Sequence, residues 1–250
     1  MLEVFPRDPP MRLVVSLLSA SLLLAGTPPP AASKDPASLA LNQVLAKFYE
    51  AQGGLARLKH IQSRRVHGHL EGLPGKVSFD QINARPDRYR LETRTIPAVG
   101  APVSIRVKTC AGKMGWTWSE GQVPQQLTPT EVQVLDADFD GPCVDAEAKG
   151  NRLDYLGIQI FRDQKAVVIR VTLQDGRIQT LYLDPRTYLK FAQVNGEGKA
   201  GMELDFRDYR AVEGMPMAFT VITGPVSVRV DRIDLNIPVT DAEFQPPTGK

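Results

Sequence analysis

The sequence predicts a mainly β protein with a few α-helices, built on one curled, mostly antiparallel sheet. Residues 167–173 alternate apolar and polar side chains, which is the period of a half-buried strand. Similar short spans recur along the chain, separated by Pro, Gly and Asp turn residues. Only two main stretches have helical character, near residues 36–52 and 129–135. A sheet of about ten or eleven strands must curl, and we expect these helices to cover its concave side.

The centre of the predicted sheet is the meander of residues 165–194. Its first arm places Val167, Ile169 and Val171 on one face, and its second arm places Leu181 and Leu183 on one face. The turn Gln174-Asp175-Gly176 joins them, with Asp-Gly expected to supply positive φ angles. A third strand is predicted over residues 188–194.

Both helices have recognisable starts. Asp35 can cap the first, Pro36 suits its first turn, and Gly53-Gly54 should end it. Its apolar face contains Leu41, Val44, Leu45, Phe48 and Tyr49. A short second helical turn is expected over residues 55–61. Thr128-Pro129-Thr130-Glu131 is a capping box that opens the mid-chain helix.

The first 33 residues are interpreted as a signal peptide. An apolar run over residues 13–26 follows Met11-Arg12 and precedes a Pro- and Ala-rich stretch, and translation is expected to start at Met11. The run is too short to span a bilayer, although an uncleaved membrane anchor is the alternative. The mature chain, residues 34–250, is predicted to be one exported domain.

Composition and motifs exclude several functions. The net charge is +2 with no basic block, so nucleic acid is not an expected partner. The sequence has no nucleophile elbow, zinc-protease motif or phosphate-binding glycine loop. We therefore expect no catalytic residues and no cofactor.

Two features leave alternatives open. Cys110 and Cys143 could form a disulfide in an oxidising compartment, or be two buried thiols. Asp136, Asp138, Asp140 and Glu147 fit the spacing of a calcium loop. A helix on each side of that loop is missing, so a solvated structural loop is favoured and no metal is expected.

Several segments together resemble the bacterial outer-membrane lipoprotein-sorting proteins. These segments lie in the same order between Lys47 and Pro247, and they are KFYEAQGGLARLKHIQSRRVHG, RPDRYRLE, GKMGWTWS, DFDGPCVD, DGRIQTLYLDPRTYLKFA, DYRAVEGMPMAF and RIDLNIPVTDAEFQPP. The resemblance implies a half-open antiparallel barrel with a helical lid and an apolar cavity that shields acyl chains in the Gram-negative periplasm. It implies lipoproteins or lipids as partners, with an inner-membrane donor and an outer-membrane acceptor. The arginine that anchors the lid in such carriers cannot be located here by motif.

Candidate cavity residues follow from the apolar strand faces. They are Trp116, Trp118, Val167, Ile169, Val171, Leu181, Leu183 and Met202, with Met215 and Met217 as adaptable packing. Each could equally be ordinary core. We expect loop 96–102 or the helix of residues 129–135 to act as a lid. The function predicted is a periplasmic lipid or lipoprotein carrier; a non-catalytic envelope interaction module with a packed sheet, or a calcium-binding module, are the alternatives.

Overall fold

The computed structural model describes residues 36–98, 102–135, 138–198 and 201–247. Its strands form one sheet of 13, in the order β6-β5-β4-β3-β2-β1-β13-β12-β11-β10-β9-β8-β7, and every neighbouring pair is antiparallel. The strands are β1 (Ser63–Glu71), β2 (Lys76–Ala84), β3 (Arg88–Ile96), β4 (Ser104–Ala111), β5 (Met114–Ser119), β6 (Gln125–Gln126), β7 (Arg152–Phe161), β8 (Gln164–Thr172), β9 (Ile178–Leu183), β10 (Lys190–Asn195), β11 (Met202–Val212), β12 (Met215–Thr223) and β13 (Val226–Leu235).

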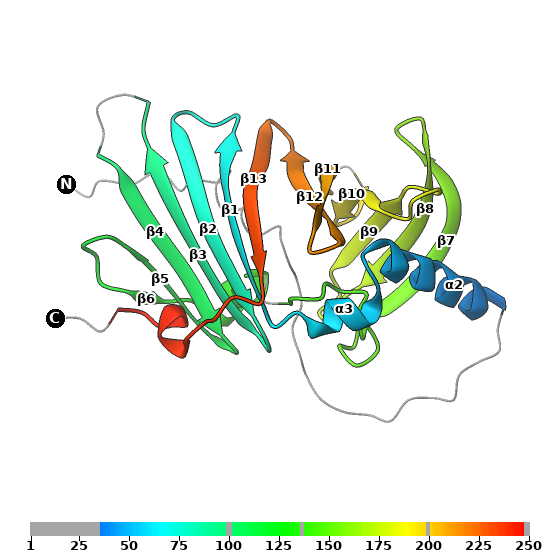
Figure 1. Cartoon of the computed structure of the whole chain (residues 1–250), viewed down its shortest axis with the longest axis horizontal. Helices are drawn as coiled ribbons and strands as arrows, with labels where there is room; N and C mark the ends of the chain where they lie inside the picture. Colours follow the sequence, from blue (N-terminus) through cyan, green and yellow to red (C-terminus); the bar gives the residue numbers. More distant parts are fainter. Residues whose placement is uncertain (1–35, 99–101, 136–137, 199–200, 248–250) are drawn as a thin grey trace.

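Two meanders make up this sheet. Strands β1–β6 form the N-terminal half, β7–β13 form the C-terminal half, and the pairing of β1 with β13 joins them. The edge strands β6 and β7 are not paired with each other, so the sheet curls without closing into a barrel. Figure 1 shows the two halves on either side of the β1–β13 seam. The predicted curled antiparallel sheet is confirmed.

The helices are few, as expected. They are α2 (Pro36–Ala51), α3 (Leu55–His60), α4 (Pro129–Val134) and the short 3-10 helix η3 (Asp241–Phe244), which was not predicted. Gly53 and Gly54 have φ of 98° and 95° after α2, a conformation that favours glycine. The Thr128 and Glu131 capping box at the start of α4 is present.

Each half buries its concave face under a different helix. In the C-terminal half, Val44 and Phe48 of α2 pack against an apolar cluster of β8 and β9. Figure 1 shows α2 lying across these strands. In the N-terminal half, Leu127, Val132 and Leu135 around α4 pack against strands β1–β4 and β11–β13. Helix α4 therefore belongs to the N-terminal core, and does not cover the space between the halves.

Four sequence-based expectations need correction. The described residues form 13 strands and not ten or eleven, and β6, with only two residues, is too short to show an alternating pattern. In the β8–β9 hairpin only Gly176 has positive φ; Asp175 does not. Tyr188 lies in the turn with φ 57°, so the third strand of the meander begins at Lys190. The sequence predicts strand character over residues 152–156, but β7 continues to Phe161, because a bulge between Tyr155 and Ile158, at Gly157, breaks the alternation without ending the strand.

Several expectations fall outside the described residues. These are the signal peptide with its start at Met11, the Asp35 cap, the middle of loop 96–102, and Asp136. Within the described part of the chain, no helix is both long and apolar enough to cross a membrane.

Candidate functional site

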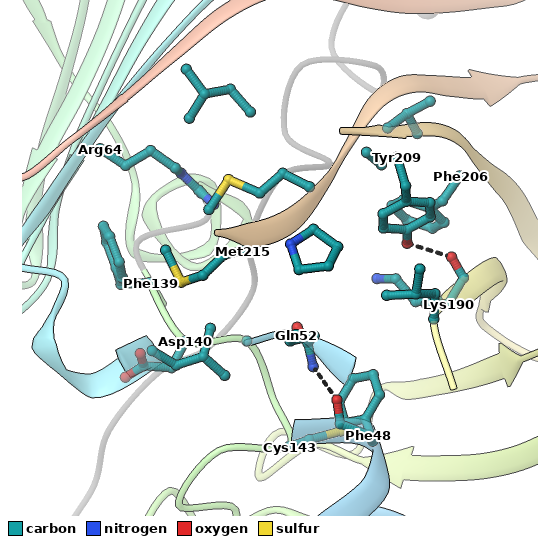
Figure 2. Close-up of a pocket in the computed structure, with 18 of the residues that line it drawn as sticks. Phe48, Gln52, Arg64, Phe139, Asp140, Cys143, Lys190, Phe206, Tyr209 and Met215 are labelled. Carbon is teal, nitrogen blue, oxygen red and sulfur yellow. Dashed lines mark hydrogen bonds between the residues drawn. The ribbon is translucent and has the colours of Figure 1, made fainter. Parts of the chain in front are cut away.

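A cavity of about 240 Å³ lies on the concave side, at the seam between the two halves of the sheet. Its walls come from the end of α2, from α3, from β1 and β9–β13, and from the loop that crosses between the halves. Figure 2 shows Arg64 on one side of this space and Lys190, Phe206 and Tyr209 on the other. The seam cavity is therefore formed by segments far apart in the sequence.

Most of the seam cavity lining is apolar and adaptable. Phe48, Phe139 and Phe206 contribute aromatic rings to the lining, and Met215 and Met217 contribute flexible thioethers. A dry apolar cavity of about 150 Å³ is large enough to admit a benzene ring. The seam cavity, at about 240 Å³, is larger than this.

One wall of the cavity is a loop that we call the acidic strap, residues 138–150. Asp138, Phe139, Asp140 and Cys143 all line the cavity. Lys149 donates to both carboxylate oxygens of Asp138 at 2.7 and 2.8 Å, and the Asp140 backbone N–H donates to the same carboxylate. The hydroxyl of Tyr49, on α2, donates to the Cys143 carbonyl at 2.7 Å. The strap is thus tied to itself and to α2.

Arg85 ties the strap to α3. Its Nη1 and Nη2 donate to the two carboxylate oxygens of Asp140 at 2.7 and 2.5 Å, and its Nε donates to the Ile61 carbonyl at 2.7 Å. The Leu58 carbonyl accepts a longer bond of 3.3 Å. The hydrogen bond to Asp140 raises the pKa of the Arg85 guanidinium, with burial opposing it. Sequence reasoning missed this residue, because Arg85-Pro86-Asp87 reads only as turn chemistry.

The ring of Phe139 lies between two guanidinium groups. Arg64 lies 5.3 Å and Arg85 lies 5.1 Å from its centroid. On the opposite wall, the Lys190 ammonium donates to Gln193 at 2.7 Å and lies 3.9 Å from the Phe206 ring centroid. The Tyr209 hydroxyl donates to the Lys190 carbonyl, and burial raises the pKa of that tyrosine. Both cations of the lining are therefore held against aromatic faces.

Most of the predicted residues of the central meander are packed core. Val167, Ile169, Val171, Leu181 and Leu183 are 0–3% exposed in the cluster beneath α2. Among these five, only Leu181 also lines the seam cavity. The side chains of α2 pack over the other four residues, which are therefore ordinary hydrophobic core.

The two tryptophans lie on the other face of the sheet. Trp116 pairs with Thr109 and Trp118 with Val107, whereas Cys110 and Gly115 form the pair that faces α4. Because residues directly opposite in an antiparallel pair share a face, both tryptophans lie opposite to α4. They share one face, as predicted, but it is not the face of the seam cavity. Trp118 stacks with the Arg90 guanidinium at 5.9 Å and borders a second pocket at the β4–β5 edge.

Met202 lies at the margin of the N-terminal core, partly buried and outside the cavity lining. Met202 is the first residue of β11, and β11 reaches the cavity only farther along, at Phe206 and Tyr209. Met215 and Met217, on β12, do line the cavity. The sequence cannot place the seam, because the seam depends on the pairing of β1 with β13.

The two cysteines are separate buried thiols. Cys110 belongs to the N-terminal core and Cys143 to the core beneath α2, so no disulfide joins them. This corrects the disulfide alternative. Burial raises the pKa of the Cys143 thiol to about 12, with Lys190 and Lys149 opposing the shift.

The acidic strap contains no assembled cation site in its described part. Asp138 and Asp140 are paired with Lys149 and Arg85, and Glu147 is not among the residues that line the cavity. Across the described residues, no group of three or more His, Cys, Asp or Glu side chains is placed to hold a metal.

No family model and no curated protein matches the sequence. Solved structures match its fold. A domain from Vibrio parahaemolyticus described as an outer membrane lipoprotein-sorting protein has a TM-score of 0.53 and 10% identity, covering 81% of this chain and 94% of its own. A DUF1329 family protein from Desulfovibrio piger has a TM-score of 0.50 and 11% identity, covering 85% and 98%. The chain therefore has the fold of the lipoprotein-sorting proteins that its sequence resembles, at identities that establish the fold alone.

Proposed function

We propose that this protein is a non-catalytic carrier that binds acyl chains of lipoproteins or related lipids in the seam cavity. The observation that carries the proposal is a cavity of about 240 Å³, lined by Phe and Met side chains on the concave side of a half-open sheet. The fold likeness to a domain described as lipoprotein-sorting supports the same class of cargo. In this proposal the carrier acts in the periplasm after export, taking cargo from an inner-membrane donor to an outer-membrane acceptor.

The driving force for cargo entry is burial of methylene groups. Each buried CH₂ contributes about 0.8 kcal/mol, so an acyl chain needs no charged contact to be held. Pockets for drug-sized ligands usually measure about 300–1,000 Å³. The seam cavity is smaller than this, so the described conformation holds part of one chain, and fuller loading requires a wall to move.

The movable wall in this proposal is the acidic strap together with α3. Arg85 is the latch, because it bonds Asp140 of the strap, the Leu58 carbonyl of α3 and the Ile61 carbonyl just after α3 at once. Opening this latch would widen the cavity and loosen the contact of Cys143 with the core beneath α2. In this proposal the strap takes the place of the helix of residues 129–135, which packs in the N-terminal core, whereas loop 96–102 lies partly outside the described residues and stays a prediction.

Native mass spectrometry of the exported, purified protein tests the proposal. We expect a bound lipid in the wild type that is lost in Met217→Trp, which fills the cavity. Met217→Leu keeps the apolar volume and should retain the lipid, and Met114→Trp should retain it because Met114, at the start of β5, is 57% exposed and outside the lining. A wild-type protein that carries no lipid and binds none from micelles would contradict the proposal. That result would favour the alternative of an envelope interaction module with a packed sheet.

A further inference from the structure

The two free edges of the sheet differ in length and polarity. One edge strand, β6, consists of the exposed Gln125 and Gln126, so it is short and polar. The other, β7, has ten residues and within the described sheet pairs only with β8. Long edge strands are usually protected by charged side chains, proline or a bulge. Strand β7 has a bulge at Gly157, but residues 157–161 beyond it carry neither a charge nor a proline.

Two large apolar side chains lie open on residues 157–161, which we call the β7 edge. Ile158 and Ile160 are 61% and 64% exposed. Ile158 pairs with Val167, which is buried in the core beneath α2, so both isoleucines lie on the α2 side of the sheet. Leu153, earlier on β7, packs against that core, whereas the two isoleucines extend beyond it.

The backbone of the same two residues faces outward. Arg162 and Asp163 have φ of 49° and 63°, which defines a two-residue type I′ turn between β7 and β8. Hydrogen bonds join the residues that flank such a turn, and hydrogen-bonded and non-hydrogen-bonded pairs then alternate along the hairpin. Ile160 and Ile158 are therefore in pairs of the second kind, and their N–H and C=O groups point away from β8. In the described part of the chain, no backbone hydrogen bond outside the strand ladders involves them.

We propose that the β7 edge binds the β7 edge of a second copy of this chain, as an antiparallel pair with its two-fold axis at Gln159. In this register Ile158 lies opposite the partner's Ile160, and Ile160 lies opposite the partner's Ile158. The outward N–H and C=O groups of both copies then meet, and the four isoleucine side chains come together on one face. No two charged side chains are opposed, because residues 157–161 carry none. The edge is thus complementary to itself in backbone as well as in side chains.

The size of the contact sets its strength. Each copy contributes about five residues, whereas a standard interface uses about 20–30 residues a side. We therefore expect a reversible dimer that forms at micromolar or higher concentration. The seam cavity lining includes no residue of β7, so this dimer and the carrier function are independent proposals.

Sedimentation equilibrium over a range of protein concentrations tests the dimer. We expect a monomer–dimer equilibrium in the wild type. Ile158→Lys should weaken the dimer by at least about tenfold, because it places two like charges in the contact. Val123→Lys is the matched control: Val123 is 84% exposed in the turn before β6, so the same substitution there should leave the dimer unchanged. Thermal melting of each variant checks that it is folded.

Cysteine crosslinking tests the register. In a Cys110→Ala, Cys143→Ala background, Gln159→Cys places one thiol of each copy at the two-fold axis. Directly opposite residues of such a non-hydrogen-bonded pair have Cα atoms about 4.5 Å apart, within the range of about 4.4–6.8 Å that a disulfide spans. Mild oxidation should therefore give a covalent dimer. Gln164→Cys is the control, since Gln164 is also exposed but lies on β8, away from the axis, and should stay monomeric.

Three results would overturn the proposal. The first is a wild-type protein that is monomeric at every concentration and shows no selective crosslink at position 159. The second is a dimer that Ile158→Lys leaves intact and in which Gln159→Cys and Gln164→Cys crosslink at equal rates, since its contact lies elsewhere. The third is a monomer whose Ile158 and Ile160 amides are protected from hydrogen exchange, which would show that another segment occupies the edge.

Discussion

The core beneath α2 and the seam cavity are built from the same kind of strand but differ in how they are filled. Beneath α2, Val44 and Phe48 occupy the space above β8 and β9, and Ile169 and Val171 are fully buried. At the seam, Met215, Met217 and Phe206 face a space of about 240 Å³. The difference teaches that alternation identifies which face is buried, whereas the reach of the covering helix decides whether that face is core or cavity.

The largest expected difference is in stability. Ile169→Ala removes a fully buried side chain beneath α2 and should lower the free energy of unfolding by about 2–5 kcal/mol, measured by chemical denaturation. Lys165→Ala on the same strand is exposed and should change it by no more than about 0.5 kcal/mol. The affinity of the folded variant for amphiphiles should remain unchanged, because Ile169 does not line the cavity. A large loss of binding with little loss of stability would reverse the assignment of the two regions.

Removal of the Arg85 latch should lower stability less than Ile169→Ala does, and it should make the Cys143 thiol more accessible to reagents. Arg85→Gln leaves the Asp140 carboxylate, whose side chain is 10% exposed, without its guanidinium and should cost about 1.5–3 kcal/mol. In a Cys110→Ala background, alkylation of Cys143 should accelerate, because the strap that carries it is released.

Arg88→Gln is the matched control for the latch. Arg88 follows the same turn. Its Nε and Nη2 donate to the Arg85 carbonyl and its Nη1 pairs with Asp241, whose side chain is 90% exposed, so a smaller loss of about 0.5–1.5 kcal/mol is expected. If Cys143 reacts at the same rate in Arg85→Gln and in Arg88→Gln, the strap is not held by the latch.

The dependence of stability on pH should report the burial of Cys143. Its pKa is raised from 9.0 to about 12 in the folded protein, so the folded state keeps a proton that the unfolded state loses. The stabilising contribution is therefore complete below pH 9 and is lost as pH rises from 9 to 12, by at most about 1.4 kcal/mol per pH unit. Tyr49, with its pKa raised to about 12, acts in the same direction. Denaturation series at pH 8, 9 and 10 should show a shallower decline in Cys143→Ala, and an equal decline would show that the thiol is not buried.

The smallest expected effect is at α4, which belongs to neither the core beneath α2 nor the cavity. Thr128→Ala removes the side chain that accepts from the Glu131 N–H and should cost about 1 kcal/mol. Thr130→Ala, within the helix and exposed, should cost less. Amphiphile affinity should be the same in both variants. A selective loss of binding in Thr128→Ala would restore α4 as a lid.

The sequence predicts the sheet well because strand alternation and turn residues are local signals. The meander of residues 165–194, the end of α2 at Gly53-Gly54 and the capping box of α4 all form. The cavity is less predictable, because it depends on the non-local pairing of β1 with β13 and on the path of the acidic strap. Leu181 is found by its pattern, but no local pattern marks Arg64 and Lys190 as lining residues or Arg85 as the residue that holds the strap. Strand alternation predicts that Trp116 and Trp118 share a face, but it does not identify which face is concave.

The central claim is that acyl chains enter the seam and not the core beneath α2. Methyl NMR of methionine-labelled protein titrated with dodecanoate tests it most directly, since Met215 and Met217 line the cavity and Met114 is exposed far from its walls. The account predicts saturable shifts of the Met215 and Met217 methyl signals, with Met114 unchanged. Saturable binding that leaves both cavity methionines unshifted would contradict it.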